Sequence, residues 1–127
     1  MTSLVFQNAI YIKGGVRLIY TTSDTVEGRE IAEYLGIVVG KAVKGVVFVR
    51  DIFAKVRDVV GGRVKSYEKE LESAIEAAFN EMAEAAQKLN ADAVVGIRCD
   101  LEALGEKGTL VGVVFTGTAV RLRDAEH

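Results

Sequence analysis

The fold is decided by residues 66–90, which have the sequence SYEKELESAIEAAFNEMAEAAQKLN. Apolar side chains recur here alternately after four and three residues, which is the spacing of one face of an α-helix. Ser66 is placed to cap the start of this helix, and Asn90 is placed to stop it. The pattern predicts a long amphipathic helix whose apolar stripe needs a partner. This stripe consists of Leu71, Ile75, Ala78, Met82, Ala85 and Leu89.

A second, shorter helical pattern lies just before the long one. Residues 51–60 carry Ile52, Val56 and Val59 at helical spacing. Gly61 and Gly62 follow, and glycine is the residue most typical of a helix end. We therefore predict a short helix closed by these two glycines.

Strand patterns flank the helices on both sides. Around Gly14 and Gly15, two runs rich in β-branched and aromatic residues predict a hairpin. Residues 31–49 are apolar but interrupted by glycines, which predicts one long bent strand or two strands. Beyond the long helix, residues 95–103 alternate between apolar and polar, which predicts a strand with one wet face. Its apolar side would comprise Val95, Ile97, Cys99, Leu101 and Ala103.

The last strand pattern, residues 110–122, is apolar on both faces. Val111, Val113 and Phe115 point to one side, and Leu110, Val114 and Val120 point to the other. Such a strand is covered on both sides. In so small a domain we expect the second cover to come from another subunit. The order of elements predicts a single α+β domain over residues 1–127, with a hairpin extension at 1–20 and a core at 21–122.

Composition excludes several classes of function. The chain has 127 residues, of which 50% are apolar, with a net charge of -2 and a mean hydropathy of +0.22. Near-neutral charge argues against a nucleic-acid binder, and no segment predicts a signal peptide or a membrane span. A single cysteine, Cys99, fits the cytoplasm, and His127 is the only histidine. Catalysis that needs a His base is therefore not expected, nor is a cofactor.

One charged segment is the best candidate for a site. The pair Arg50-Asp51 recurs seven residues later as Arg57-Asp58. On a helix, the two arginines would share one face, and so would the two aspartates. This segment could line an anionic or metal ligand, or it could form a salt-bridge network between subunits; we favour the network. Cys99 is expected to be a buried, inert thiol. The complete candidate set is Arg50, Asp51, Arg57, Asp58, Arg63, Tyr67 and Glu68.

Acidic clusters are a weaker candidate. Glu27, Glu30 and Glu33 form one cluster, and Glu68, Glu70 and Glu72 form another. Carboxylates alone suit hard cations, and the second cluster does not share one helix face, so we expect solvated surfaces.

Short motifs follow one another in a fixed order between residues 21 and 121. They are Thr21-Thr22, Val26-Glu27-Gly28, Tyr34-Leu35-Gly36-Ile37-Val38, Arg50-Asp51, Arg57-Asp58, Gly61-Gly62-Arg63, Tyr67-Glu68-Lys69-Glu70-Leu71, Ala91-Asp92-Ala93-Val94-Val95-Gly96 and Gly117-Thr118-Ala119-Val120. In these motifs the chain resembles the YbjQ family, an uncharacterised group that carries the label "putative heavy-metal-binding domain". The resemblance implies a YbjQ-like, dodecin-like protomer: a curved antiparallel sheet packed on one long helix plus a short helix. It also implies a ring oligomer, with a homopentamer favoured. Where the family has Gly-Glu, this chain has Gly40-Lys41, which weakens the metal label.

We therefore expect a cytoplasmic homo-oligomer that is a structural or binding protein, not an enzyme, with itself as its main partner. Neither nucleic acid nor membrane is expected as a partner. The alternative is metal-ion or small-ligand binding at the subunit interface, through the candidate set given above.

Overall fold

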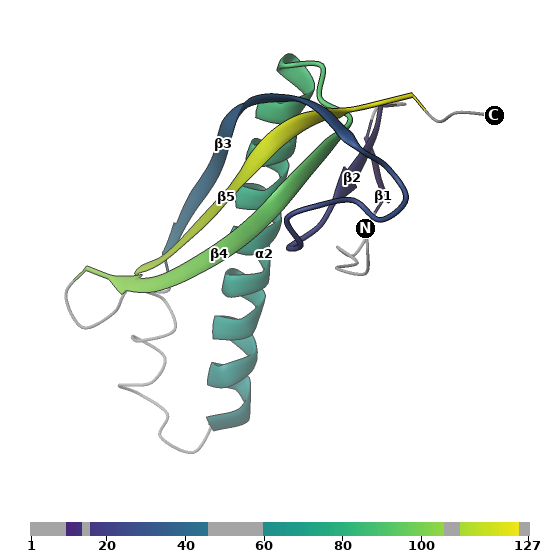
Figure 1. Cartoon of the computed structure of the whole chain (residues 1–127). Coiled ribbons are helices and arrows are strands. Elements are labelled where there is room, and N and C mark those ends of the chain that lie inside the picture. Colours follow the sequence, from purple (N-terminus) through teal and green to yellow (C-terminus); the bar gives the residue numbers. More distant parts are fainter. Residues whose placement is uncertain (1–9, 14–15, 46–59, 106–109, 125–127) are drawn as a thin grey trace.

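The structure is a computed structural model that describes residues 10–13, 16–45, 60–105 and 110–124. A long helix lies across one side of a curved sheet (Figure 1). The sheet has the strand order β1-β2-β4-β5-β3. Its elements are β1 (Ile10–Lys13), β2 (Val16–Tyr20), β3 (Ile31–Gly45), α2 (Val60–Lys88), β4 (Ala93–Leu104) and β5 (Leu110–Leu122).

The predicted α+β class and the packing of one long helix on a sheet are confirmed. The sheet is mixed, however, and not wholly antiparallel. β1 pairs with β2, and β5 pairs with both β3 and β4, in antiparallel fashion. β2 instead runs parallel to the start of β4, through the pairs Ile19–Ala93 and Tyr20–Val94. The N-terminal hairpin is therefore an extension of the sheet at its β4 side.

Helix α2 is longer than the sequence indicated. It begins at Val60 and includes Gly61, Gly62 and Ser66. The predictions of a helix end at the glycines and of a cap at Ser66 were therefore wrong. A glycine within a helix costs only about 1 kcal/mol, which packing of the apolar stripe can offset. The predicted short helix over 51–60 lies, apart from Val60, outside the described residues.

The C-terminal end of α2 is confirmed. Asn90 has a φ of 58°, in the left-handed region that asparagine tolerates better than most residues. The Ala91 amide donates to the Ala86 carbonyl at 3.1 Å, and the Asn90 amide donates to the Gln87 carbonyl at 2.9 Å. These two bonds form a Schellman motif, which reverses the chain into β4.

β3 is the one long bent strand that the glycines predicted, as far as Gly45. Its register against β5 shifts between Tyr34 and Gly36, where Gly36 has a φ of 140°. β4 contains a similar bulge between Val95 and Arg98, with Gly96 at a φ of 62°. This second bulge changes which side chains face the helix, so the predicted single apolar face of β4 was wrong at Val95.

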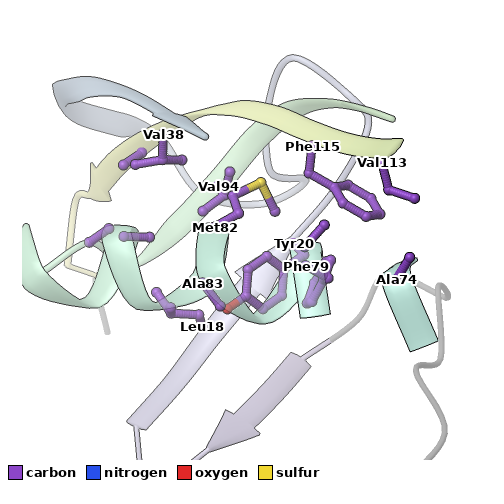
Figure 2. Packing of buried hydrophobic residues seen from close by; sticks show 14 of the residues in the cluster. Leu18, Tyr20, Val38, Ala74, Phe79, Met82, Ala83, Val94, Val113 and Phe115 are labelled. Atoms are coloured by element: carbon purple, nitrogen blue, oxygen red, sulfur yellow. The ribbon is translucent and has the colours of Figure 1, made fainter. Parts of the chain in front are cut away.

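The main core lies between α2 and the sheet (Figure 2). Phe79 of the helix is its centre, with ring centroids 4.7 Å from Tyr20 and 5.5 Å from Phe115. Such tilted and edge-on pairs add to the stabilisation that burial provides. Met82 and Val113 are fully buried beside them.

Helix and sheet approach most closely at Gly40. A Cβ atom added there would lie 1.9 Å from the Ala78 carbonyl oxygen and 2.4 Å from the Met82 amide nitrogen. Only glycine therefore allows the β3 backbone to lie directly on α2. Small helix residues contribute to this approach, because Ala74, Ala78 and Ala83 are fully buried.

A smaller apolar cluster covers the opposite side of the sheet near the end of β5. Val120 and Leu122 pack there against Val26 and Ile31, which belong to the same chain. The prediction that both faces of β5 are covered is thus confirmed at Val120, but the cover comes from the same chain and not from another subunit.

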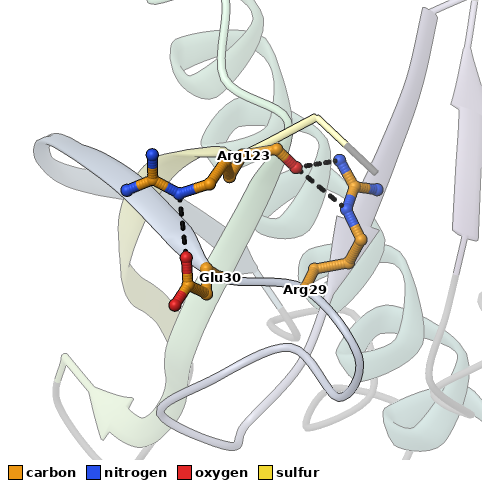
Figure 3. A network of polar contacts seen from close by, with 3 residues as sticks. All are labelled: Arg29, Glu30 and Arg123. Atoms are coloured by element: carbon orange, nitrogen blue, oxygen red, sulfur yellow. Dashed lines mark hydrogen bonds and ion pairs between the residues drawn. The ribbon is translucent and has the colours of Figure 1, made fainter. Parts of the chain in front are cut away.

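Polar contacts hold residues 21–30 against the end of β5 (Figure 3). Arg29 donates from Nε and Nη2 to the Arg123 carbonyl oxygen, at 3.3 and 3.0 Å. Arg123 Nε lies 2.8 Å from Glu30 Oε2. Residues 29 and 30 are therefore held against Arg123, the residue directly after β5.

We predict that Gly40→Ala lowers the free energy of unfolding by about 2–3 kcal/mol, because the added methyl group forces β3 away from the helix backbone. The measurement is urea denaturation followed by circular dichroism, at one protein concentration. Gly45→Ala is the matched control: its Cβ would meet only Leu110, at 3.6 Å. We expect this control to change stability by less than about 0.5 kcal/mol. Equal effects of the two variants would contradict the close approach at Gly40.

Candidate functional site

The predicted charged segment is largely outside the described residues. Arg50, Asp51, Arg57 and Asp58 lie in residues 46–59, which the structure does not describe. Arg63 and Tyr67 belong to the first turns of α2, where only the backbone is described. Glu68 is exposed on the same helix. Whether these residues come together therefore stays a prediction.

The described residues offer no ready-made metal centre. Within the described ranges, no three side chains of His, Cys, Asp or Glu lie close enough together to hold a metal ion. Glu30 forms an ion pair with Arg123, and Glu27 and Glu33 are exposed. A heavy-metal ion would prefer thiolate or imidazole ligands, and among the described residues Cys99 alone carries such a group. The donor set of the described part thus does not fit such an ion.

The sheet face that points away from α2, here called the outer face, carries a row of exposed apolar side chains. Val38 and Gly40 face the helix, so their neighbours Ile37 and Val39 face outward. Ile37 is 78% exposed, Val43 58% and Val114 37%. The row occupies the last strand of the sheet and its neighbour, which is unusual for a surface in water. The outer apolar row consists of Ile37, Val39, Val43 and Val114.

Charged side chains flank the outer apolar row. Lys41 and Asp100 both pair with Val114, one on each side of β5, so all three share the outer face. Arg98 and Glu102 lie on this face by the same register. Lys41 Nζ is 3.9 Å from Glu81 Oε1, and both side chains are at least half exposed. Such an exposed pair contributes little stability and leaves the lysine available.

The face that bears the helix, here called the inner face, is not covered by any described element along the second half of β4. Cys99 pairs with Phe115, and Leu101 pairs with Val113, so both side chains lie on the inner face. α2 packs against β3 and β5, however, and does not reach this part of β4. Leu101 is consequently 52% exposed, and Cys99 is exposed. The prediction that Cys99 is buried was therefore wrong, although the face assigned to it was right.

The environment of Cys99 makes it a poor nucleophile. Partial desolvation by surrounding atoms, and then the negative charge of Asp100, raise the pKa of the Cys99 thiol above its ordinary value. Because the thiolate is the reactive form, the raised pKa lowers the reactivity of Cys99 at neutral pH.

Two of the hollows on the described surface are lined by residues of known position. The first, of about 280 Å³, is lined by Ile19, Arg29, Asp92 and Leu122. Its polar groups have structural partners: Asp92 Oδ2 accepts from the Leu122 amide at 2.8 Å, and Arg29 donates to Arg123. The second, of about 500 Å³, runs along one side of α2. Its described lining is Lys69, Glu72, Ser73, Glu76, Ala77 and Asn80.

The arrangement defines a class of protein: an α+β domain whose described sheet carries a row of exposed apolar side chains on the face away from the helix. A family model described as "putative heavy-metal-binding" matches residues 18–123, and the chain belongs to this family, YbjQ. A crystal structure of a protein of unknown function, of the DUF74 family from Pediococcus pentosaceus, has a similar fold. The two chains are 14% identical with a TM-score of 0.55, over 84% of this chain and 98% of the other.

The outer apolar row was missed by the sequence analysis, apart from Val114. A signal for it exists, because Ile37, Val38 and Val39 are apolar in succession and a strand cannot bury all three on one face. As for membranes, none of the described helical residues forms a segment long and apolar enough to cross one.

We predict that a maleimide alkylates Cys99 in folded protein that has been diluted to single chains, and that the midpoint of the alkylation rate against pH lies above that of a free cysteine. Asp100→Asn should lower this midpoint, because it removes a negative charge that disfavours the thiolate. The measurement is alkylation rate against pH, followed by mass spectrometry. Glu27→Gln, an exposed change on a different segment, should leave the midpoint unchanged. Reaction only after unfolding would contradict the exposure of Cys99.

Proposed function

We propose that this protein is a cytoplasmic homo-oligomer with a structural or binding role and no chemistry of its own. The observation that carries the proposal is the outer apolar row on an exposed strand of a folded sheet. Ile37 and Val43 expose more than half of their surface there. Burying each such side chain would stabilise an assembly by about 1.5–3 kcal/mol. A second copy of the chain is the simplest partner for this surface.

The number of subunits is proposed from the family. The resemblance of this chain to the YbjQ family favours a pentamer. A closed ring would leave no apolar row exposed to which a further copy could bind. The uncovered second half of β4 supports assembly as well, because Leu101 lies on the inner face without a covering helix. A pentamer would thus cover both surfaces in every subunit.

The second candidate is metal or small-ligand binding at the subunit interface, with the charged segment as the site. It is favoured by the description of the family alone, since no described side chains form a metal centre. Asp51 and Asp58 would supply its carboxylates. Such hard ligands suit calcium or magnesium better than a heavy metal.

We expect native mass spectrometry and light scattering to show an assembly of several chains, and Ile37→Lys to shift it toward single chains. The lysine places a charge where the assembly buries an apolar side chain, and several kcal/mol of interface energy would be lost. Circular dichroism should stay that of the wild type, because Ile37 lies outside the core. Thr25→Lys, at an exposed position of the loop, is the control and should assemble normally. A wild-type monomer at micromolar concentration would overturn the proposal.

The same native spectra test the second candidate. For protein purified without added metal, we expect a mass that is a whole multiple of the chain mass. An excess that repeats once per subunit, and that disappears in Asp51→Asn/Asp58→Asn while the assembly persists, would instead establish ligand binding. Loss of the assembly in that variant, with no excess mass in the wild type, would make the charged segment an interface network.

A further inference from the structure

We propose that the hollow at the end of β5 binds a small zwitterion, namely an aliphatic α-amino acid with one carboxylate and one ammonium group. The hollow has a volume of about 280 Å³ and is lined by Ile19, Arg29, Asp92 and Leu122. It combines one cationic, one anionic and two apolar side chains. Because its volume is below that of typical pockets for drug-sized ligands, it suits a smaller molecule. This site is separate from the charged segment and does not depend on the proposed homo-oligomer.

Arg29 offers one edge of its guanidinium group to an anion. Its Nε and Nη2 atoms donate to the Arg123 carbonyl oxygen, at 3.3 and 3.0 Å, which uses the other edge of the group (Figure 3). The remaining edge consists of Nη1 and the second hydrogen of Nη2, and it has no partner among the described residues. Such an edge of an arginine matches the two oxygens of a carboxylate.

The positive charge of Arg29 is not balanced within the described part of the chain. Its hydrogen-bond acceptor is a backbone carbonyl, which carries no net charge. The adjacent acidic residue, Glu30, pairs instead with Arg123 at 2.8 Å. No described carboxylate forms an ion pair with Arg29. Since Arg29 is only partly exposed, an anion bound to it would be screened less than on an open surface.

Asp92 supplies the opposite charge from a rigidly held position. Its amide donates to the Val120 carbonyl at 2.8 Å, and its carbonyl accepts from the Ile19 amide at 3.2 Å. Its Oδ2 atom accepts from the Leu122 amide at 2.8 Å. The other carboxylate oxygen, Oδ1, has no partner among the described residues and can accept a hydrogen bond from an ammonium group. A group that is held in place before binding loses little freedom when the ligand arrives.

The two charges approach the end of β5 from opposite sides. Asp92 directly precedes β4 and Arg29 lies two residues before β3, and these two strands flank β5. Asp92 binds the amide of residue 122 and Arg29 binds the carbonyl of residue 123, whose Cα atoms are about 3.8 Å apart. Within the described structure, Arg29 and Asp92 form no ion pair with each other. Opposite charges that line one hollow without pairing suit a ligand with the complementary two charges, and an α-amino acid carries both on one carbon atom.

The apolar part of the hollow indicates the type of side chain. Ile19 and Leu122 both belong to the apolar cluster near the end of β5. The described lining holds no polar side chain besides Arg29 and Asp92. An aliphatic side chain of the ligand would therefore gain from burial there, whereas a charged one would lose its hydration without a partner.

Titration of the wild-type protein with L-leucine tests the proposal. We expect NMR spectra to show saturable shifts of the Asp92 and Leu122 amides at millimolar ligand. The matched compounds are 4-methylpentanoate, which is leucine without its ammonium group, and 3-methylbutylamine, which is leucine without its carboxylate. Each should bind at least about tenfold more weakly than L-leucine, because a charge-assisted hydrogen bond is lost.

Two variants each remove one charge of the hollow. Arg29→Gln and Asp92→Asn should each weaken the binding of L-leucine by about tenfold or more. The asparagine still offers an oxygen to the Leu122 amide, and circular dichroism shows whether both variants fold as the wild type does. Lys88→Gln and Glu27→Gln, which change exposed charges outside the hollow, are the controls and should leave the affinity unchanged.

Three results would overturn the proposal: no binding of L-leucine at millimolar concentration, equal binding of 4-methylpentanoate and L-leucine, or an affinity that both hollow variants leave unchanged. The second result would establish a site for an anion alone. If a variant does not fold, the comparison of the three compounds on the wild-type protein decides. None of these results changes the number of chains in the assembly, so the proposed function is tested separately.

Discussion

The backbone-to-backbone contact between β3 and α2 at Gly40 is the constraint on which the rest of the structure depends. It places the helix over β3 and β5, because a side chain at this position would collide with the Ala78 carbonyl. The faces of the strands then follow from the period of two along each strand. Val38 and Phe115 are directed into the core, while Ile37 and Val114 are directed outward.

The same contact decides which surfaces stay open. A single helix cannot cover all of a five-stranded sheet, and α2 leaves the second half of β4 without cover. The loop of residues 21–30, tied down through Arg29 and Arg123, covers only the end of β5 on the outer face. What remains is an apolar row along β3 and β5 and an uncovered strand at β4. Both features support the proposal that the chain associates with another copy of itself.

Much of the fold was predictable because its signals are local. The stripe of α2, the end of this helix at Asn90, the hairpin and the bend of β3 each depend on neighbouring residues. The stripe was wrong at Leu89, which is 40% exposed. The wrong predictions involve contacts between distant segments. Gly61 and Gly62 lie within a helix that packing stabilises, and the burial of Cys99 depends on where α2 crosses the sheet. The predicted charged site falls mostly in residues 46–59, so only Glu68 could be placed by its side chain.

Hydroxyl-radical footprinting of side chains tests most directly the central claim that a second copy of the chain covers the outer apolar row. Ile37 and Val43 expose 78% and 58% of their surface in the single chain. We predict that both side chains are oxidised slowly in the assembled wild-type protein and faster after dilution to single chains. Equal oxidation rates in the two states would contradict the claim.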